Sequence, residues 1–220
     1  MLPLRLGSPA SEWAIRVAPA ASTANAAAAS WLVSTIRSGR AYPLVKFVHW
    51  GQGNYHAALI VRADSPFRKV SDLRHRRAGW VEPRSTSGYL FPRLLLQRAG
   101  LDSERFFAQH AFLGGRGRVV EAVLERRVDV GATYCAFGPR GELLASSWLQ
   151  HYPARAREIR VLDSIGPIPS DVVIARHDVP PAVTTAVRRA FLRMHGDAEG
   201  RALLSSLFTA KRTLAAPISW

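Results

Sequence analysis

From Tyr42 onward, short apolar runs alternate with amphipathic segments, and this alternation limits the fold more than any other feature of the chain. Ala57–Val61, for example, is a continuous apolar run of the buried-strand type. The predicted strands are Leu44–Trp50, Ala57–Val61, Ala78–Val81, Phe106–Leu113, Val128–Thr133, Ile159–Leu162 and Asp171–Ala175, and the predicted helices are Tyr89–Ala99, Val119–Arg127, Pro181–His195 and Ala198–Phe208. Strands that alternate with helices are typical of an α/β fold with mostly parallel sheets.

The size and composition of the chain exclude several other classes of protein. Its 220 residues have room for one large domain or two lobes, and 48% are apolar, so the chain can bury a core without a disulfide or metal staple. No stretch approaches about 20 uninterrupted apolar residues, so no membrane span is predicted. The single cysteine, Cys135, excludes an intramolecular disulfide and a CxxC zinc site, and the seven histidines lack metal-ligand spacing. We expect neither a metal nor a cofactor.

The charge balance favours an anionic partner. Thirty Lys and Arg residues against sixteen Asp and Glu residues give a formal net charge of +14. Such a balance fits a nucleic acid, a phosphate-bearing small molecule or an acidic surface. The basic residues are scattered along the chain rather than gathered into one arm, which argues against a nucleic-acid partner.

The first 33 residues differ from the rest of the chain. Met1–Val33 has a proline-broken start and an Ala/Ser-rich run, Ala18–Ser30, and lacks the basic region and unbroken apolar core of a secretory signal. Cytoplasmic residence and a truncated sequence both stay open as explanations.

Three predicted loops carry residues that could bind an anion. Ser85-Thr86-Ser87-Gly88 lies between a predicted strand and a predicted helix, where free backbone N–H groups and three hydroxyls would form an oxyanion cradle. One Ser would serve as an ordinary N-cap, but three hydroxyls followed by Gly favour a binding loop. Gly114–Gly117 contains Arg116, an anion donor or a solvated turn residue. Asp171 could hold a ligand amine or cap local backbone.

No catalytic arrangement is visible, so an enzyme is not expected. The chain has no GxSxG, no HExxH and no phosphate-binding GxxxxGK[ST] motif. Cys135 lies just past an apolar strand without an obvious basic partner, and it is interpreted as a small buried hydrophobe.

The run Tyr55–Pro66, the turn Val70–Leu73 and the loop Ser85–Tyr89 (STSGY) resemble the phosphate, phosphite and phosphonate-binding proteins of ABC importers. Val128–Ala132 and Ile168–Asp171 are also similar to that family, and the resemblance covers roughly residues 41–208. It implies the two-lobed type 2 periplasmic-binding-protein fold. Residues 1–58 and 165–220 would form an incomplete first lobe with an atypical N-terminal segment, and residues 59–164 the second lobe with the oxyanion loop.

The resemblance also implies roles for single residues. Ser85, Thr86 and Ser87 would hold the ligand oxygens, Tyr55 would close over them, and Asp171 would face a substrate amine. Arg116 stands where the family usually has His. No acid occurs near Tyr134-Cys135 at the position of a family carboxylate, which favours a simple anion such as phosphate or phosphite.

The expected function is capture of a phosphorus oxyanion (phosphonate, phosphite or phosphate) in a cleft between the lobes, for an ABC importer permease. By resemblance the location is periplasmic. The alternatives are a cytoplasmic sensor domain of the same fold that binds a small anion and, less favoured, a basic nucleic-acid-binding protein.

Overall fold

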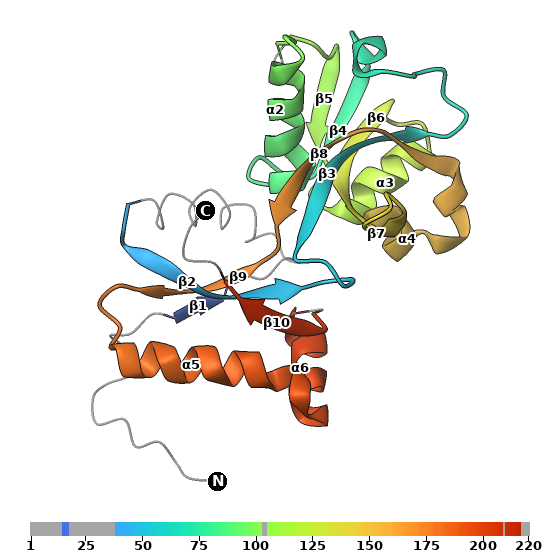
Figure 1. Cartoon of the computed structure of the whole chain (residues 1–220). Coiled ribbons are helices and arrows are strands. Elements are labelled where there is room, and N and C mark those ends of the chain that lie inside the picture. Colours follow the sequence, from blue (N-terminus) through green and yellow to red (C-terminus); the bar gives the residue numbers. More distant parts are fainter. Residues whose placement is uncertain (1–14, 18–37, 103–104, 209, 217–220) are drawn as a thin grey trace. The chain divides into compact units, whose positions relative to one another are not determined.

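The computed structural model describes residues 15–17, 38–102, 105–208 and 210–216, and these residues form two compact units (Figure 1). Unit 1 contains the described residues of 15–17, 38–49 and 171–216, and unit 2 contains those of 50–170. Among the described residues, those of unit 1 therefore come from two parts of the sequence, one before and one after residues 50–170.

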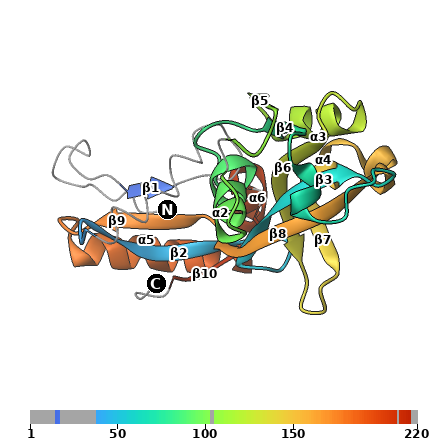
Figure 2. The same ribbon diagram turned by 90° about the horizontal axis from the view of Figure 1, so that it is seen from above.

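Unit 1 is a four-stranded sheet with helices packed against it. The strand order is β1 (Ile15–Val17), β9 (Val172–Arg176), β2 (Ala41–Val48) and β10 (Arg212–Ala215), and every neighbouring pair is antiparallel. Helix α5 (Pro181–Arg193) runs along one face of this sheet, and α6 (Ala198–Phe208) follows it (Figures 1 and 2). The fully buried Phe47 ring meets Phe191 of α5 edge to face, with 6.1 Å between ring centroids. The three-residue β1 was not predicted from the sequence.

Unit 2 contains a six-stranded sheet. Its order is β5 (Gln109–Phe112), β4 (Arg77–Trp80), β6 (Val130–Phe137), β3 (Asn54–Arg62) and β8 (Ile159–Pro169), with β7 (Leu143–Ser146) paired to β6. The helices are α2 (Phe91–Arg98), α3 (Arg116–Leu124) and the short α4 (Ser147–His151). Short 3-10 helices occur at Val70–Leu73 and Pro153–Glu158.

The side chains of alternate residues of β3 lie on opposite faces of this sheet. Ala57, Leu59 and Val61 belong to the buried cluster that includes Leu95 and Leu96 of α2. Their neighbours Ala58 and Ile60 belong to the cluster formed with α3. Because successive side chains of a strand point to opposite faces, helices on both sides explain why Ala57–Val61 is apolar at every position.

The α/β class is confirmed, but the expectation of mostly parallel sheets is not. The sheet of unit 1 is antiparallel, and the sheet of unit 2 is mixed. Only β4 pairs in parallel, with β5 and with β6, and the other described pairs are antiparallel. Parallel neighbours need a crossover of a dozen or more residues, which the segments containing α2 and α3 supply. Alternation of strands and helices along a sequence does not reveal that the long β3 has antiparallel neighbours on both sides.

The expected lobe boundaries, 58/59 and 164/165, fall inside β3 and β8. These two strands pair from Asn54 with Pro169 to Arg62 with Ile159, which keeps the whole of both strands in unit 2. The compact units divide instead between His49 and Trp50 and between Ser170 and Asp171.

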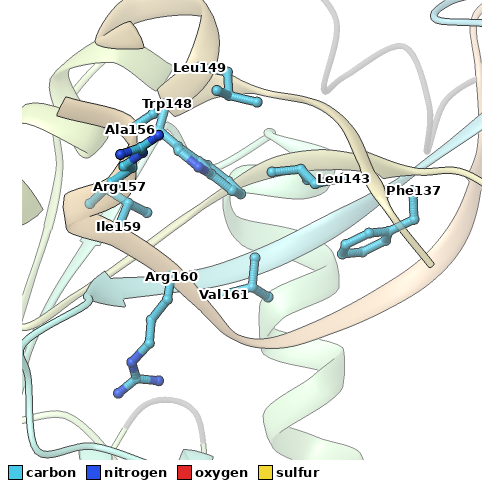
Figure 3. Close-up of a pocket in the computed structure, with 9 residues that line it drawn as sticks. All are labelled: Phe137, Leu143, Trp148, Leu149, Ala156, Arg157, Ile159, Arg160 and Val161. Carbon is cyan, nitrogen blue, oxygen red and sulfur yellow. The ribbon is translucent and has the colours of Figure 1, made fainter. Parts of the chain in front are cut away.

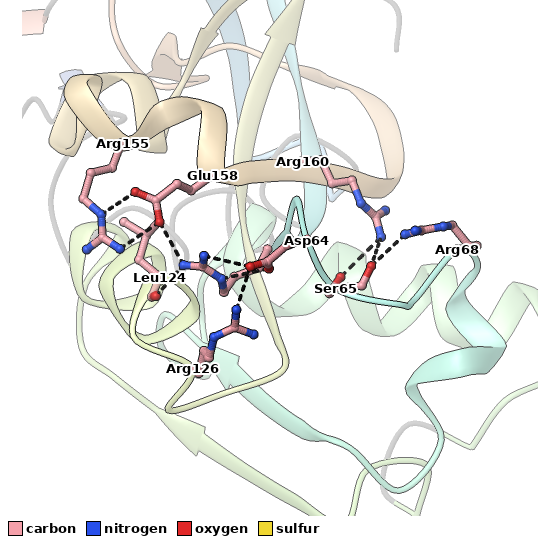
Figure 4. A network of polar contacts seen from close by, with 9 residues as sticks. Asp64, Ser65, Arg68, Leu124, Arg126, Arg155, Glu158 and Arg160 are labelled. Carbon is pink, nitrogen blue, oxygen red and sulfur yellow. Dashed lines mark hydrogen bonds and ion pairs between the residues drawn. The ribbon is translucent and has the colours of Figure 1, made fainter.

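Arg62, at the end of β3, bonds to three segments of unit 2 through its partners Asp64, Leu124 and Glu158, which Figure 4 labels. Its Nη1 donates to the Leu124 carbonyl at the end of α3 (2.8 Å) and to Glu158 (2.9 Å), and its Nε donates to Asp64 (3.0 Å). Arg155 Nε also donates to Glu158, at 2.7 Å. The hydrogen bonds from Arg155 and Arg62 lower the pKa of Glu158 to about 2, because both favour the charged carboxylate.

This lowered pKa predicts an acid-dependent loss of stability. The folded-state pKa of Glu158 lies below its ordinary value of 4.5. Its ion pairs therefore stabilise the fold above about pH 4.5, and this stabilisation is lost as the pH falls towards 2. We expect Glu158→Gln to flatten the decline of unfolding free energy in this range, measured by urea unfolding at a series of pH values. Glu199→Gln, an exposed change outside the network, should leave the profile unchanged; equally steep profiles for wild type and Glu158→Gln would contradict the prediction.

Candidate functional site

The residues Ser85–Gly88, here called the hydroxyl turn, connect β4 to α2. The last three of these residues begin a π-helical turn, Thr86–Leu90, that continues directly into α2. Ser85 begins this turn as its N-cap: its Oγ accepts a hydrogen bond from Gly88 N at 3.0 Å, and its carbonyl accepts one from Leu90 N at 2.9 Å. The Ser85 hydroxyl therefore does the work of an N-cap within a turn that carries two further hydroxyls.

Thr86 and Ser87 carry the two hydroxyls of the turn that do not serve as the N-cap. They are 6% and 2% exposed, yet neither hydroxyl makes a hydrogen bond to any other residue that the structure describes. A hydroxyl group carries one O–H donor, which can bond to a ligand oxygen where no protein acceptor takes it. These two groups are therefore the most suitable donors for the oxygens of a bound anion.

Gly88 allows the turn to pack tightly against β4 and its continuation. A Cβ atom added at Gly88 would lie 2.6 Å from Val81 Cβ and 2.7 Å from Ser85 Oγ, closer than real Cβ atoms approach other atoms. The backbone is also fixed there, because Val81 N donates to the Gly88 carbonyl at 3.2 Å. Only glycine fits this position.

Arg116 is the first residue of α3 and lies over an aromatic ring of β6. Its Cζ is 5.1 Å from the centroid of the Tyr134 ring, within the range of a cation–π contact. Tyr134 also stacks on Trp50, with ring centroids 5.5 Å apart, and its hydroxyl donates to Gln150 at 2.7 Å. Burial raises the pKa of Tyr134, and the positive charge of Arg116 partly opposes this. Sequence reasoning had not singled out Gln150, because only the fold brings it to Tyr134.

The hydroxyl turn, Tyr55 and Arg116 all belong to unit 2 and lie around the same two strands. The π-helical turn contacts β6 and β3. Tyr55 is half-buried in β3 and packs against the cluster that contains Trp80. The Arg116 contact with Tyr134 lies on β6. Strands β3 and β6 are therefore the common support of these predicted site residues.

Asp171, the sixth predicted site residue, lies in unit 1. Its carboxylate Oδ2 is 3.4 Å from Nε2 of His49, which is 4% exposed, and its carbonyl accepts a hydrogen bond from Phe47 N at 2.9 Å. Asp171 therefore has a partner within its own unit. In the sequence His49 lies near the end of the predicted strand Leu44–Trp50, and no local pattern there indicates Asp171 as its partner.

Cys135 neighbours Tyr134 on β6 and is fully buried. Burial raises the pKa of its thiol to about 12, so the thiolate is nearly absent at neutral pH. Its interpretation as a small buried hydrophobe agrees with this environment.

The described residues contain neither a candidate metal site nor a membrane-spanning helix. Within residues 15–17, 38–102, 105–208 and 210–216, no group of three or more His, Cys, Asp or Glu side chains is arranged to hold a metal ion. No helix in the same ranges has the length and apolar character needed to cross a bilayer.

Comparison with known proteins gives these observations a family. The family model for the periplasmic substrate-binding protein of phosphonate ABC transporters matches residues 28–218, which includes 28–40, beyond the resemblance read from the sequence. A Xanthomonas citri protein solved with ATP bound is similar at 26% identity and a TM-score of 0.69, over 87% of this chain and 70% of its own.

Two further solved structures share the fold at lower identity. A binding-protein component of an ABC phosphonate transporter from Pseudomonas aeruginosa has 22% identity and a TM-score of 0.64, over 87% of this chain and 61% of its own. A Prochlorococcus marinus protein in complex with methylphosphonate has 16% identity and a TM-score of 0.63, over 86% and 70%. With the family match extending from residue 28 to residue 218, the chain belongs to the periplasmic phosphonate substrate-binding proteins of ABC transporters and has their type 2 periplasmic-binding-protein fold.

Proposed function

We propose that this protein binds a phosphorus oxyanion (phosphonate, phosphite or phosphate) at the hydroxyl turn and presents it to an ABC importer permease, in the periplasm and without chemical change. The observation that carries the proposal is the pair of hydroxyls on the buried residues Thr86 and Ser87, which have no hydrogen-bond partner among the described residues. Family membership supports the ligand class and the transport role.

The chemistry of the turn suits an oxyanion. Hydroxyl and backbone N–H groups can each donate a hydrogen bond to a charged oxygen, and hydrogen bonds to charged groups are stronger than neutral ones. The turn also lies at the start of α2, where the helix dipole favours negative charge. Arg116 is permanently charged, and its guanidinium would add a charged donor to the neutral donors of the turn.

A calorimetric titration with methylphosphonate, phosphite and phosphate tests the proposal, with sulfate and a short DNA duplex as competing anions. We expect saturable binding of at least one phosphorus oxyanion by the full chain. Removing both hydroxyls with Thr86→Val and Ser87→Ala should weaken it about a hundredfold or more, since each hydrogen bond to a charged oxygen contributes about 1.5–3 kcal/mol.

The controls separate binding from folding. Thr86→Val and Ser87→Ala keep the Ser85 cap, so the melting temperature should change little. Ser206→Ala removes an exposed hydroxyl of α6 and should not change affinity. Full affinity in the double variant would refute the assignment of the turn, and binding that is confined to DNA would favour the nucleic-acid alternative.

A further inference from the structure

A hollow in the surface of unit 2 has no part in the site described above. It is open to solvent, has a volume of about 300 Å³ and lies beside β7, α4 and the first residues of β8 (Figure 3). Neither the hydroxyl turn nor Arg116 lines it. The lining residues are Phe137, Leu143, Trp148, Leu149, Ala156, Arg157, Ile159, Arg160 and Val161.

The lining is apolar and partly open to solvent. Seven of its nine side chains are hydrophobic. Leu143 and Leu149 are 38% and 40% exposed, whereas the Trp148 ring at the back is 3% exposed. Exposed leucines that stand singly on a surface need no explanation, but here two of them edge a hollow with an aromatic wall. A volume of 300 Å³ lies at the small end of the range for small-molecule pockets and is far smaller than a protein interface requires.

Among the lining residues that the structure describes, the charged groups are two guanidinium groups, and one of them has no partner. Arg160 directs its Nη2 to the carbonyls of Ser65 and Phe67, and Figure 3 shows its guanidinium turned away from the apolar side chains. Arg157 is exposed and makes no hydrogen bond or ion pair with another described residue. Arg157 and Trp148 both line the hollow (Figure 3). The hollow therefore combines an apolar wall with one available cation and no acidic lining residue.

We propose that this hollow is a second ligand site, which takes a small amphipathic carboxylate. The alkyl or aryl tail would lie against Trp148 and the exposed leucines, and the carboxylate would pair with Arg157, whose planar fork matches carboxylate geometry. At roughly 30 Å³ for each water-sized group, 300 Å³ admits a ligand of about ten heavy atoms. This inference is independent of the phosphorus oxyanion proposed for the hydroxyl turn.

Octanoate has the required size and charge and serves as the probe. Titration of the ¹⁵N-labelled full chain should show saturable one-to-one binding, with a chemical-shift change at the Trp148 indole N–H. 1-Octanol keeps the tail without the charge, and acetate keeps the charge without the tail. Both should bind at least tenfold more weakly than octanoate.

Three variants locate the site. Arg157→Gln should weaken octanoate binding at least tenfold and leave 1-octanol binding unchanged, whereas Arg98→Gln, an exposed arginine of α2, should have no effect. Ala156→Leu should fill the hollow and abolish binding of both. Should Ala156→Leu fail to fold, Leu149→Ser at an exposed position must weaken both probes. Methylphosphonate binding should be the same in all these variants.

Three results would each overturn the proposal. Absence of saturable octanoate binding, full affinity in Arg157→Gln, or saturation without any change at the Trp148 indole would each show that the hollow is not a carboxylate site.

Discussion

Replacing Gly88 with alanine is expected to destabilise the protein by about 2–5 kcal/mol and to abolish anion binding at the hydroxyl turn. The added methyl group would lie 2.6 Å from Val81 Cβ and 2.7 Å from Ser85 Oγ. Overpacking of this kind costs about 1–3 kcal/mol, and displacing Ser85 also breaks the N-cap, which is worth about 0.5–2 kcal/mol. Urea unfolding measures the first effect, and titration with methylphosphonate measures the second.

Gly196→Ala is the matched control for this prediction. A Cβ atom at Gly196 would meet no other atom within 4 Å, and the residue lies in unit 1, outside the hydroxyl turn. Stability and binding should both stay at wild-type values in this variant. If Gly88→Ala behaved like Gly196→Ala, the close approach of the turn to Val81 would be wrong.

Trp80→Ala is expected to cost about 3–5 kcal/mol of unfolding free energy, which corresponds to a fall of roughly 6–20 °C in melting temperature. Trp80 is 2% exposed, and its ring meets those of Tyr89 and Phe107 edge to face, with centroids 5.7 and 5.5 Å apart. Truncation would leave a large cavity directly beneath Tyr89, which belongs to the π-helical turn. Thermal unfolding followed by circular dichroism measures the loss.

Two other variants show whether burial is the cause. Trp50 is 39% exposed, so Trp50→Ala should cost clearly less than Trp80→Ala, although it removes an equally large ring. Trp80→Phe keeps an aromatic ring in the core and should recover part of the loss. Equal losses in Trp50→Ala and Trp80→Ala would contradict the packing described for β4.

The segments whose pattern was purely local were predicted well. Helix α6 was predicted with both ends correct, and Asp197 Oδ1 accepts from Gly200 N at 2.6 Å at its start, a bond typical of a helix N-terminus. Strand β8 shows the opposite case. It was predicted to end at Leu162 but continues to Pro169 through two prolines. Proline is tolerated in a strand at the edge of a sheet, and the position of β8 at that edge is a property of the fold alone.

The candidate site also combines features that are local in the sequence with contacts that only the fold creates. Three hydroxyls before a helix could be recognised from local sequence, because loop composition and helix start are local features. The sequence left open which of the three hydroxyls serves as the N-cap, and it could not reveal that Arg116 lies over Tyr134. Nor could it pair Asp171 with His49, more than a hundred residues away. Such partners depend on strand register, which no local pattern encodes.

The composition of unit 1 from two distant parts of the chain governs the order in which it can assemble on the ribosome. Both neighbours of β2 in its sheet, β9 and β10, are encoded after unit 2. The nascent chain therefore carries β2 with unpaired backbone groups on both edges while all of residues 50–170 are made. Because translation adds only about 5–20 residues per second, this exposure lasts for seconds, and unit 2 has every strand of its own sheet before β9 and β10 are made.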